Sequence, residues 1–138
     1  MLNSIIIMGR LTRDPELRRT NSGTAVTSFT LAVDRDYSGK DSNERKTDFI
    51  DCVAWRSTGE FVDKYFTKGR MAVVIGKLQM RDWTDKDGNK RRTFEINADT
   101  VYFGDSKRND SSNVNTSENE SAFTGEFTPV DDDDDFPF

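Results

Sequence analysis

Apolar side chains in the first hundred residues recur at every second position, and this spacing restricts the possible fold more than any other feature of the chain. In the segment that starts at Val26, for example, Phe29, Leu31 and Val33 alternate with polar or small residues. Successive side chains of a β-strand point to opposite faces, so a period of two predicts strands with one buried face. The chain therefore indicates a fold built mainly from strands.

Breaks in this alternation divide the region into five predicted strands and one helix. We predict the strands at 2–13, 26–33, 47–55, 71–83 and 92–103. A helix is predicted at 58–68, where Ser57 and Glu60 have the spacing of a capping box. Three strands, a helix and two further strands follow the order of the OB-fold. The predicted class is therefore all-β: a five-stranded Greek-key barrel with a helix between strands 3 and 4.

The strands at 47–55 and 71–83 each have a second face that is not typical of a core. In the first of these strands, the face expected to be buried holds Ile50, Cys52 and Ala54, and the other holds Phe49, Asp51, Val53 and Trp55. In the second strand, the corresponding sets are Val74, Gly76, Leu78 and Met80 on one side and Lys77, Gln79, Arg81 and Trp83 on the other. We expect each second face to be in contact with solvent, because charged and amide groups interrupt it.

Aromatic rings with cations between them are what single-stranded nucleic acid binding requires. Rings stack on bases of any sequence, and Lys and Arg side chains follow the phosphates. Tyr37 beside Arg35, and the hairpin residues Lys90 and Arg91, extend the pattern. The alternative is that each exposed ring packs under a loop or at a subunit contact, and that Lys77 and Arg81 belong to an ordinary solvated face. Cys52 is expected to be a small buried residue.

Charge is distributed unevenly along the chain. Residues 1–108 hold 20 basic and 16 acidic residues, a net charge of +4, whereas residues 109–138 hold nine acidic residues and no basic one. From 109 to 121 the composition is almost entirely Asn, Ser, Thr, Asp and Glu, which favours disorder. We therefore expect a folded domain at 1–106, a disordered linker at 107–130 and an acidic tip at 131–138.

Several function classes are excluded or disfavoured by composition. Without any His, the chain cannot form a Ser-His-Asp or Cys-His catalytic system or a His-ligated metal site. Its single Cys fits a reducing compartment, and the longest apolar run, at 5–8, is far too short to span a membrane. We expect a soluble cytoplasmic protein that is not an enzyme, takes no cofactor or metal and does not associate with membranes.

Particular motifs resemble the bacterial and bacteriophage single-stranded DNA-binding proteins. They include Gly9-Arg10-Leu11-Thr12, Asp14-Pro15-Glu16, Asp48-Phe49-Ile50 and the spacing of Gly76, Leu78, Arg81 and Trp83. The resemblance covers about residues 1–104. It implies a homotetramer that coats single-stranded DNA in replication, recombination and repair, near the nucleoid or in a host cytoplasm if the source is viral. It also implies base stacking on Tyr37, Phe49, Trp55 and Trp83. The expected basic contacts are Arg35, Arg56, Lys68, Lys77, Arg81, Lys90 and Arg91.

The acidic tip resembles the partner-binding terminus of the same family. It consists of Asp131, Asp132, Asp133, Asp134, Asp135, Phe136, Pro137 and Phe138. We expect its rings to enter an apolar pocket on replication, recombination or repair proteins while the aspartates steer the encounter. The alternatives are a tail that only maintains solubility, a metal-dependent nuclease with Asp131–Asp135 as ligands, and an OB module for RNA or for a structural assembly.

Overall fold

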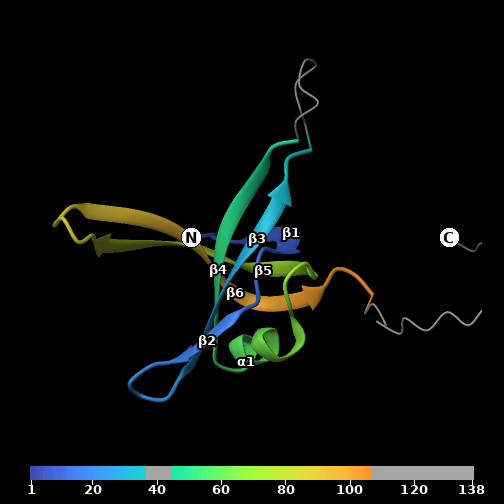
Figure 1. Ribbon diagram of the computed structural model, residues 1–138, viewed down its shortest axis with the longest axis horizontal. Helices are drawn as coiled ribbons and strands as arrows, with labels where there is room; N and C mark the ends of the chain where they lie inside the picture. The colour runs from blue at the N-terminus through green and yellow to red at the C-terminus, as the bar shows by residue number, and fades with distance from the viewer. Residues whose placement is uncertain (37–44, 107–138) are drawn as a thin grey trace, which may run out of the picture. The chain divides into compact units, whose positions relative to one another are not determined.

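The structure is a computed structural model that describes residues 1–36 and 45–106 (Figure 1). Its elements, in chain order, are β1 (Ile5–Leu11), β2 (Glu16–Arg19), β3 (Ala25–Asp34), β4 (Thr47–Trp55), α1 (Arg56–Tyr65), β5 (Met71–Thr84) and β6 (Lys90–Phe103). No helix in this part of the chain is long and apolar enough to cross a membrane.

The five long strands close into a ring. The sheet order is β1-β5-β6-β4-β3-β2, and an additional β1–β3 pairing through Arg10 and Leu11 joins the two ends of the five-stranded part. The β4–β6 pair is parallel and the other pairs are antiparallel. This closed barrel with its helix between the third and fourth long strands confirms the predicted OB-fold class. The short strand β2, which pairs with β3 outside the ring, was not predicted.

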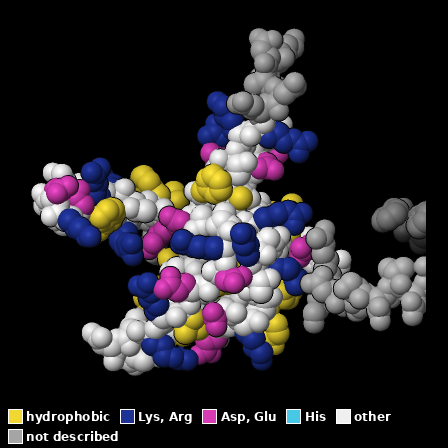
Figure 2. Space-filling model, in the orientation of Figure 1, with side chains coloured by type: hydrophobic (Ala, Val, Ile, Leu, Met, Phe, Trp, Pro, Cys, Tyr) yellow, Lys and Arg dark blue, Asp and Glu magenta, His cyan; other side chains and the backbone are white. Residues whose placement is uncertain are grey.

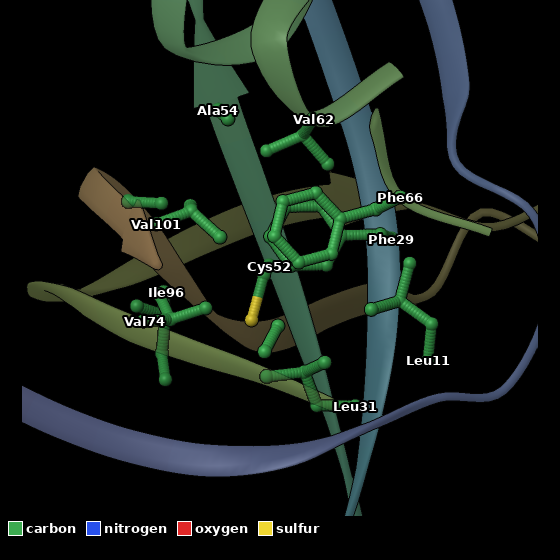
Figure 3. Packing of buried hydrophobic residues seen from close by; sticks show 12 residues of the cluster. Leu11, Phe29, Leu31, Cys52, Ala54, Val62, Phe66, Val74, Ile96 and Val101 are labelled. Carbon is green, nitrogen blue, oxygen red and sulfur yellow. The ribbon is translucent and has the colours of Figure 1, made fainter. Parts of the chain in front are cut away.

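The barrel interior is filled by the alternate residues that the sequence pattern assigned to it (Figure 3). Phe29 and Leu31 of β3 are 1% and 0% exposed, and Cys52 of β4 lies beside them. Helix α1 closes one end with Val62, and Phe66 just beyond the helix is also buried. Burial of each such side chain stabilises the fold by about 1.5–3 kcal/mol relative to exposure.

Two details of the helix prediction are wrong. Helix α1 begins at Arg56 and ends at Tyr65, and its N-cap Trp55 makes no side-chain capping hydrogen bond. The predicted capping box therefore does not form, and Glu60 instead lies 3.5 Å from the Arg19 guanidinium. Arg56 adopts a positive φ of 55°, which lets the chain turn directly from β4 into the helix.

The predicted inward position of Leu78 and Met80 is also wrong. These side chains are 44% and 53% exposed because β5 and β6 continue beyond the barrel as a long hairpin (Figure 1). The pairing of β5 with β6 shifts register between Ile75 and Gly76, where the strands leave the barrel. The alternation of side chains continues along the hairpin. The strand face that points into the core within the barrel points to solvent in the hairpin, because no core lies there.

Candidate nucleic-acid interface

Strand β4 places two aromatic rings on the outside of the barrel. Cys52 and Ala54 of this strand point into the core, so Phe49, Asp51, Val53 and Trp55 share the opposite face. Phe49 is 69% exposed and Trp55 is 45% exposed. The exposure of both rings agrees with the prediction from alternation. At the rise of a strand, the six residue steps from Phe49 to Trp55 span about 20 Å.

The third described ring, Trp83, stands on the β5–β6 hairpin. It is 45% exposed, and its Nε1–H donates a hydrogen bond of 2.8 Å to Thr93 Oγ1 on the paired strand. This bond orients the indole while leaving ring surface open to solvent. A hollow of about 570 Å³ lies beside the ring, and its lining includes Lys90 and Arg91. The hairpin thus combines one aromatic ring with several cationic groups.

A groove joins the Trp55 side of the barrel to the base of this hairpin. It consists of two hollows of about 310 and 190 Å³ that share Ser28, Val53, Arg81 and Glu95 in their linings. Trp55 lines the larger hollow, and Thr93, the hydrogen-bond partner of Trp83, lines the smaller one. We call these two hollows the central groove. Arg81 and Trp83 extend from the same face of β5, so the groove and the hairpin ring belong to one surface.

Three of the predicted basic contacts are engaged with acidic groups. Arg35 donates two hydrogen bonds, of 2.9 and 2.8 Å, to Asp48. These bonds are the main cause of a lowered pKa at the Asp48 carboxyl. Lys77 lies 3.9 Å from Asp99. Arg91 lies 3.0 Å from Asp85. Within these pairs the cations remain more than half exposed, so they can still approach a phosphate.

The other predicted cations have no ion pair with any residue in the described parts of the chain. These are Arg56, Lys68, Arg81 and Lys90. Arg81 lies in the central groove and Lys90 at the hairpin. Lys68 is in the α1–β5 connection, where its backbone N–H donates to Asp14 Oδ1 at 2.8 Å, and it does not line the central groove or the hollow beside Trp83. The geometry therefore places Lys68 apart from the central groove.

Three arginines that we did not predict also line the groove. Arg13 borders the smaller hollow, and Arg18 and Arg19 border the larger one. Arg18 and Arg19 belong to β2, whose four residues are too few to give a recognisable alternation. The signal that could have found them is the pair of adjacent arginines just before the turn at 21–23, which returns the chain to β3. Figure 2 shows that Lys and Arg side chains are interspersed with Asp and Glu side chains on the face it draws.

Two of the predicted sites lie outside the described residues. Tyr37 falls in the segment 37–44, and the acidic tip falls in 107–138. Their expected roles stay predictions.

Cys52 is not a reactive group. Burial raises the pKa of its thiol to about 12, and the neighbouring Asp51 carboxylate acts in the same direction. Only the thiolate is nucleophilic, so this side chain is inert near neutral pH. It serves as a core residue, as its position on the inward face of β4 predicted.

The fold is a five-stranded barrel closed by one helix, and exposed rings lie beside a groove lined by guanidinium groups. These features define the class of binding proteins that have an OB-fold. Residues 2–104 match the Single-strand binding protein family. The chain is 37% identical to single-stranded DNA-binding protein 2 of Listeria monocytogenes, over the full length of both chains. It is 40% identical to the single-stranded DNA-binding protein of Caldanaerobacter subterraneus, again over both full lengths. It is 46% identical to single-stranded DNA-binding protein A of Bacillus subtilis, over 75% of this chain and 59% of that protein. The chain belongs to the single-strand binding protein family.

Proposed function

We propose that this protein binds single-stranded DNA of any sequence and coats it during replication, recombination and repair. The observation that carries the proposal is the exposure of Phe49, Trp55 and Trp83 along a surface that also presents arginines. Membership of a family whose relatives are named single-stranded DNA-binding proteins supports it. The protein is not an enzyme, and its place of action is the cytoplasm, near the nucleoid.

The chemistry of binding follows from two kinds of contact. Each ring that stacks on an unpaired base contributes about 1–3 kcal/mol, and the stacking accepts any base because every base has a π-face. Cations such as Arg81 neutralise phosphates and release counterions, so affinity falls as salt rises. Duplex DNA hides its base faces inside the helix, so a surface of this kind favours single strands.

Competition between nucleic acids tests the proposal. We expect the full-length protein to bind a dT oligomer much more tightly than the matching duplex, with a negative slope of log affinity against log salt. A uridine oligomer separates the RNA alternative, because only RNA carries the 2′-hydroxyl. Incubating labelled strands with Mg²⁺ tests the nuclease alternative, for which we expect no cleavage. Equal affinity for duplex and single strand would contradict the proposal.

The domain division is part of the same proposal. Residues 1–106 form the DNA-binding domain, 107–130 a disordered linker, and 131–138 the acidic tip that recruits replication, recombination and repair proteins. A run of aspartates followed by an apolar Phe-Pro-Phe sequence supports a recognition peptide, because a tail that only maintains solubility has no need of two rings.

Removal of Phe138 is expected to abolish recruitment of partner proteins while leaving affinity for dT oligomers unchanged. The reason is that the ring fills an apolar pocket on the partner, whereas DNA contacts the barrel. Pull-down of partners by immobilised protein–DNA complexes measures the first effect, and a DNA titration of the same variant measures the second. A matched control replaces Val114 by Ala in the linker. Normal recruitment by the shortened chain would refute the assignment.

We propose that the protein is a homotetramer. Strand β1 pairs with β5 along Ile5–Arg10 and with β3 only at Arg10 and Leu11, which leaves most of one edge of β1 open in the described structure. Ile6 and Met8 on this strand are 66% and 56% exposed. Open edges and clustered apolar side chains are features that monomers avoid, so they support association between copies of the chain.

Replacement of Ile6 by Asp is therefore expected to lower the molar mass in solution from that of four chains to that of two or one. The new charge would be desolvated in a subunit contact, whereas in an isolated barrel it would lie in water. Light scattering coupled to gel filtration measures the mass. Lys64→Asp on the exposed helix surface is the control. A wild-type protein that is already monomeric would contradict the proposal.

A further inference from the structure

The β5–β6 hairpin presents two different faces where it projects beyond the barrel (Figure 1). Residues directly opposite each other in a pair of strands point to the same side. Trp83 and its opposite residue Arg91 therefore lie on one face together with Arg81, and we call this the front face. The other side, which we call the reverse face, consists of Met80, Asp82, Thr84, Lys90, Arg92 and Phe94. The hairpin is a ribbon that a ligand can contact from both sides.

Two large apolar side chains lie uncovered on the reverse face. Phe94 is 59% exposed, and Met80, directly opposite it, is 53% exposed. Nearer the barrel, Leu78 lies opposite Ile96, which is fully buried, so the core ends between Ile96 and Phe94. An isolated two-stranded hairpin is only marginally stable in water, and clustered apolar side chains on a surface mark a place of contact. We therefore expect a ligand or partner to cover Phe94.

The charges beside Phe94 indicate what that ligand is. Arg92 and Lys90 precede the ring by two and four residues on the same face of β6. Arg92 lies 3.0 Å from Asp82 but stays 60% exposed, and Lys90 has no ion pair with any residue of the described parts. The centre of a protein–protein contact is depleted of charged groups, whereas a ring with cations beside it is suited to a single strand of nucleic acid.

The reverse face is also continuous with the surface around Trp83. The hollow of about 570 Å³ beside that ring is lined by Trp83 and Arg91 of the front face and by Lys90 and Arg92 of the reverse face. The outer edge of β6 at 90–95 has no strand partner among the described residues, because the pairing with β4 begins only beyond it. A flexible strand can therefore pass over this edge from one face to the other.

We infer that Phe94 is a further stacking platform for DNA. A strand that stacks on Trp83 crosses the open edge of β6 and stacks a second base on Phe94, while Lys90 and Arg92 contact its phosphates. The inference rests on the proposed single-stranded DNA binding and extends the bound path to the reverse face. Alternation alone assigned Phe94 to the same side as the buried Ile96, so only the exposure of the hairpin reveals this role.

Replacement of Phe94 by Ala tests the inference by its effect on affinity. We expect the full-length variant to bind a labelled dT oligomer about fivefold or more weakly than wild type, the lower bound for one stacked base. Phe94→Trp keeps a ring at this position and should keep the affinity. Leu78→Ala is the matched control, since it removes another exposed apolar side chain from the hairpin but no ring. Unchanged affinity of the Phe94→Ala variant, or an equal loss in the control, would overturn the inference.

Fluorescence provides a readout that a merely structural role of Phe94 would not change. The variant Trp55→Phe/Trp83→Phe/Phe94→Trp holds its only Trp on the reverse face, and saturation with a dT oligomer should quench its emission. Constant emission while a labelled strand is bound would overturn the inference. So would a lower molar mass of DNA-free Phe94→Ala protein in light scattering, since the face would then be a contact between copies of the chain. Failure of the wild-type protein to bind the oligomer would instead overturn the proposed function.

Discussion

Replacing Trp55 and Trp83 together by Ala is expected to weaken binding of a labelled dT oligomer by about 30-fold or more. Each ring that stacks on a base contributes about 1–3 kcal/mol, so two rings at the lower end of this range together give about 2 kcal/mol when their effects add. The rings are each 45% exposed, and neither belongs to the buried core. The double variant should therefore keep the wild-type circular dichroism spectrum and molar mass.

Tyr65→Ala supplies the matched control for this experiment. Tyr65 is 47% exposed, close to the exposure of the two tryptophans, but it lies at the end of α1 and packs near Phe61 with ring centroids 5.1 Å apart. It does not line the central groove or the hollow beside Trp83. If DNA stacks specifically on the groove and hairpin rings, this truncation leaves affinity unchanged. Equal losses in both proteins would indicate that exposed aromatic area in general, and not this surface, determines binding.

Replacing Gly76 by Ala is expected to destabilise the protein by about 2 kcal/mol or more and to weaken DNA binding as well. A Cβ at this position would clash with the carbonyl oxygen of Asn97, which belongs to the backbone of the paired strand and cannot rotate away. The two strands would have to separate at the point where their register shifts. Clashes with backbone in a packed site are among the few changes that cost this much. Urea unfolding followed by circular dichroism measures the loss.

The effect on DNA binding follows because this junction directs the hairpin. Trp83, Lys90 and Arg91 lie beyond it, and their position relative to Trp55 depends on how β5 and β6 leave the barrel. Leu78→Ala, two residues further along the same strand and 44% exposed, is the control that changes the hairpin without a clash. Wild-type stability of the Gly76 variant would contradict the close approach of the two strands.

Much of the fold could be predicted because the barrel is built from strands in which apolar and polar side chains alternate. A residue such as Phe29 or Cys52 follows the period of two, and the closed ring buries each such position. The errors arose where the tertiary context decides whether a side chain is buried. Leu78 and Met80 continue the same pattern as Val74, but a pattern within one strand cannot indicate where the barrel ends and an isolated hairpin begins. The strand β2 was missed because four residues carry too little periodicity.

The site could be predicted where one strand alone determines which way a ring points. Phe49 and Trp55 share a face with Asp51, and a charged neighbour is sufficient to assign that face to solvent. The contribution of Arg13 could not be foreseen, since its place in the groove depends on the closure of β1 onto β3. The adjacent arginines Arg18 and Arg19 were a signal in the sequence, but their place in the groove depends on the pairing of β2 with β3. The engagement of Arg35 with Asp48 likewise depends on the pairing of β3 with β4.

Tryptophan fluorescence tests most directly whether these rings stack on bases. The chain contains 2 Trp, so Trp55→Phe and Trp83→Phe each leave a single reporter with an aromatic ring retained at the other position. Titration with a dT oligomer should quench the emission of both variants, with saturation at the same ratio of DNA to protein. Emission that stays constant in both variants while a labelled strand is bound would show that DNA binds elsewhere, and the account would fail.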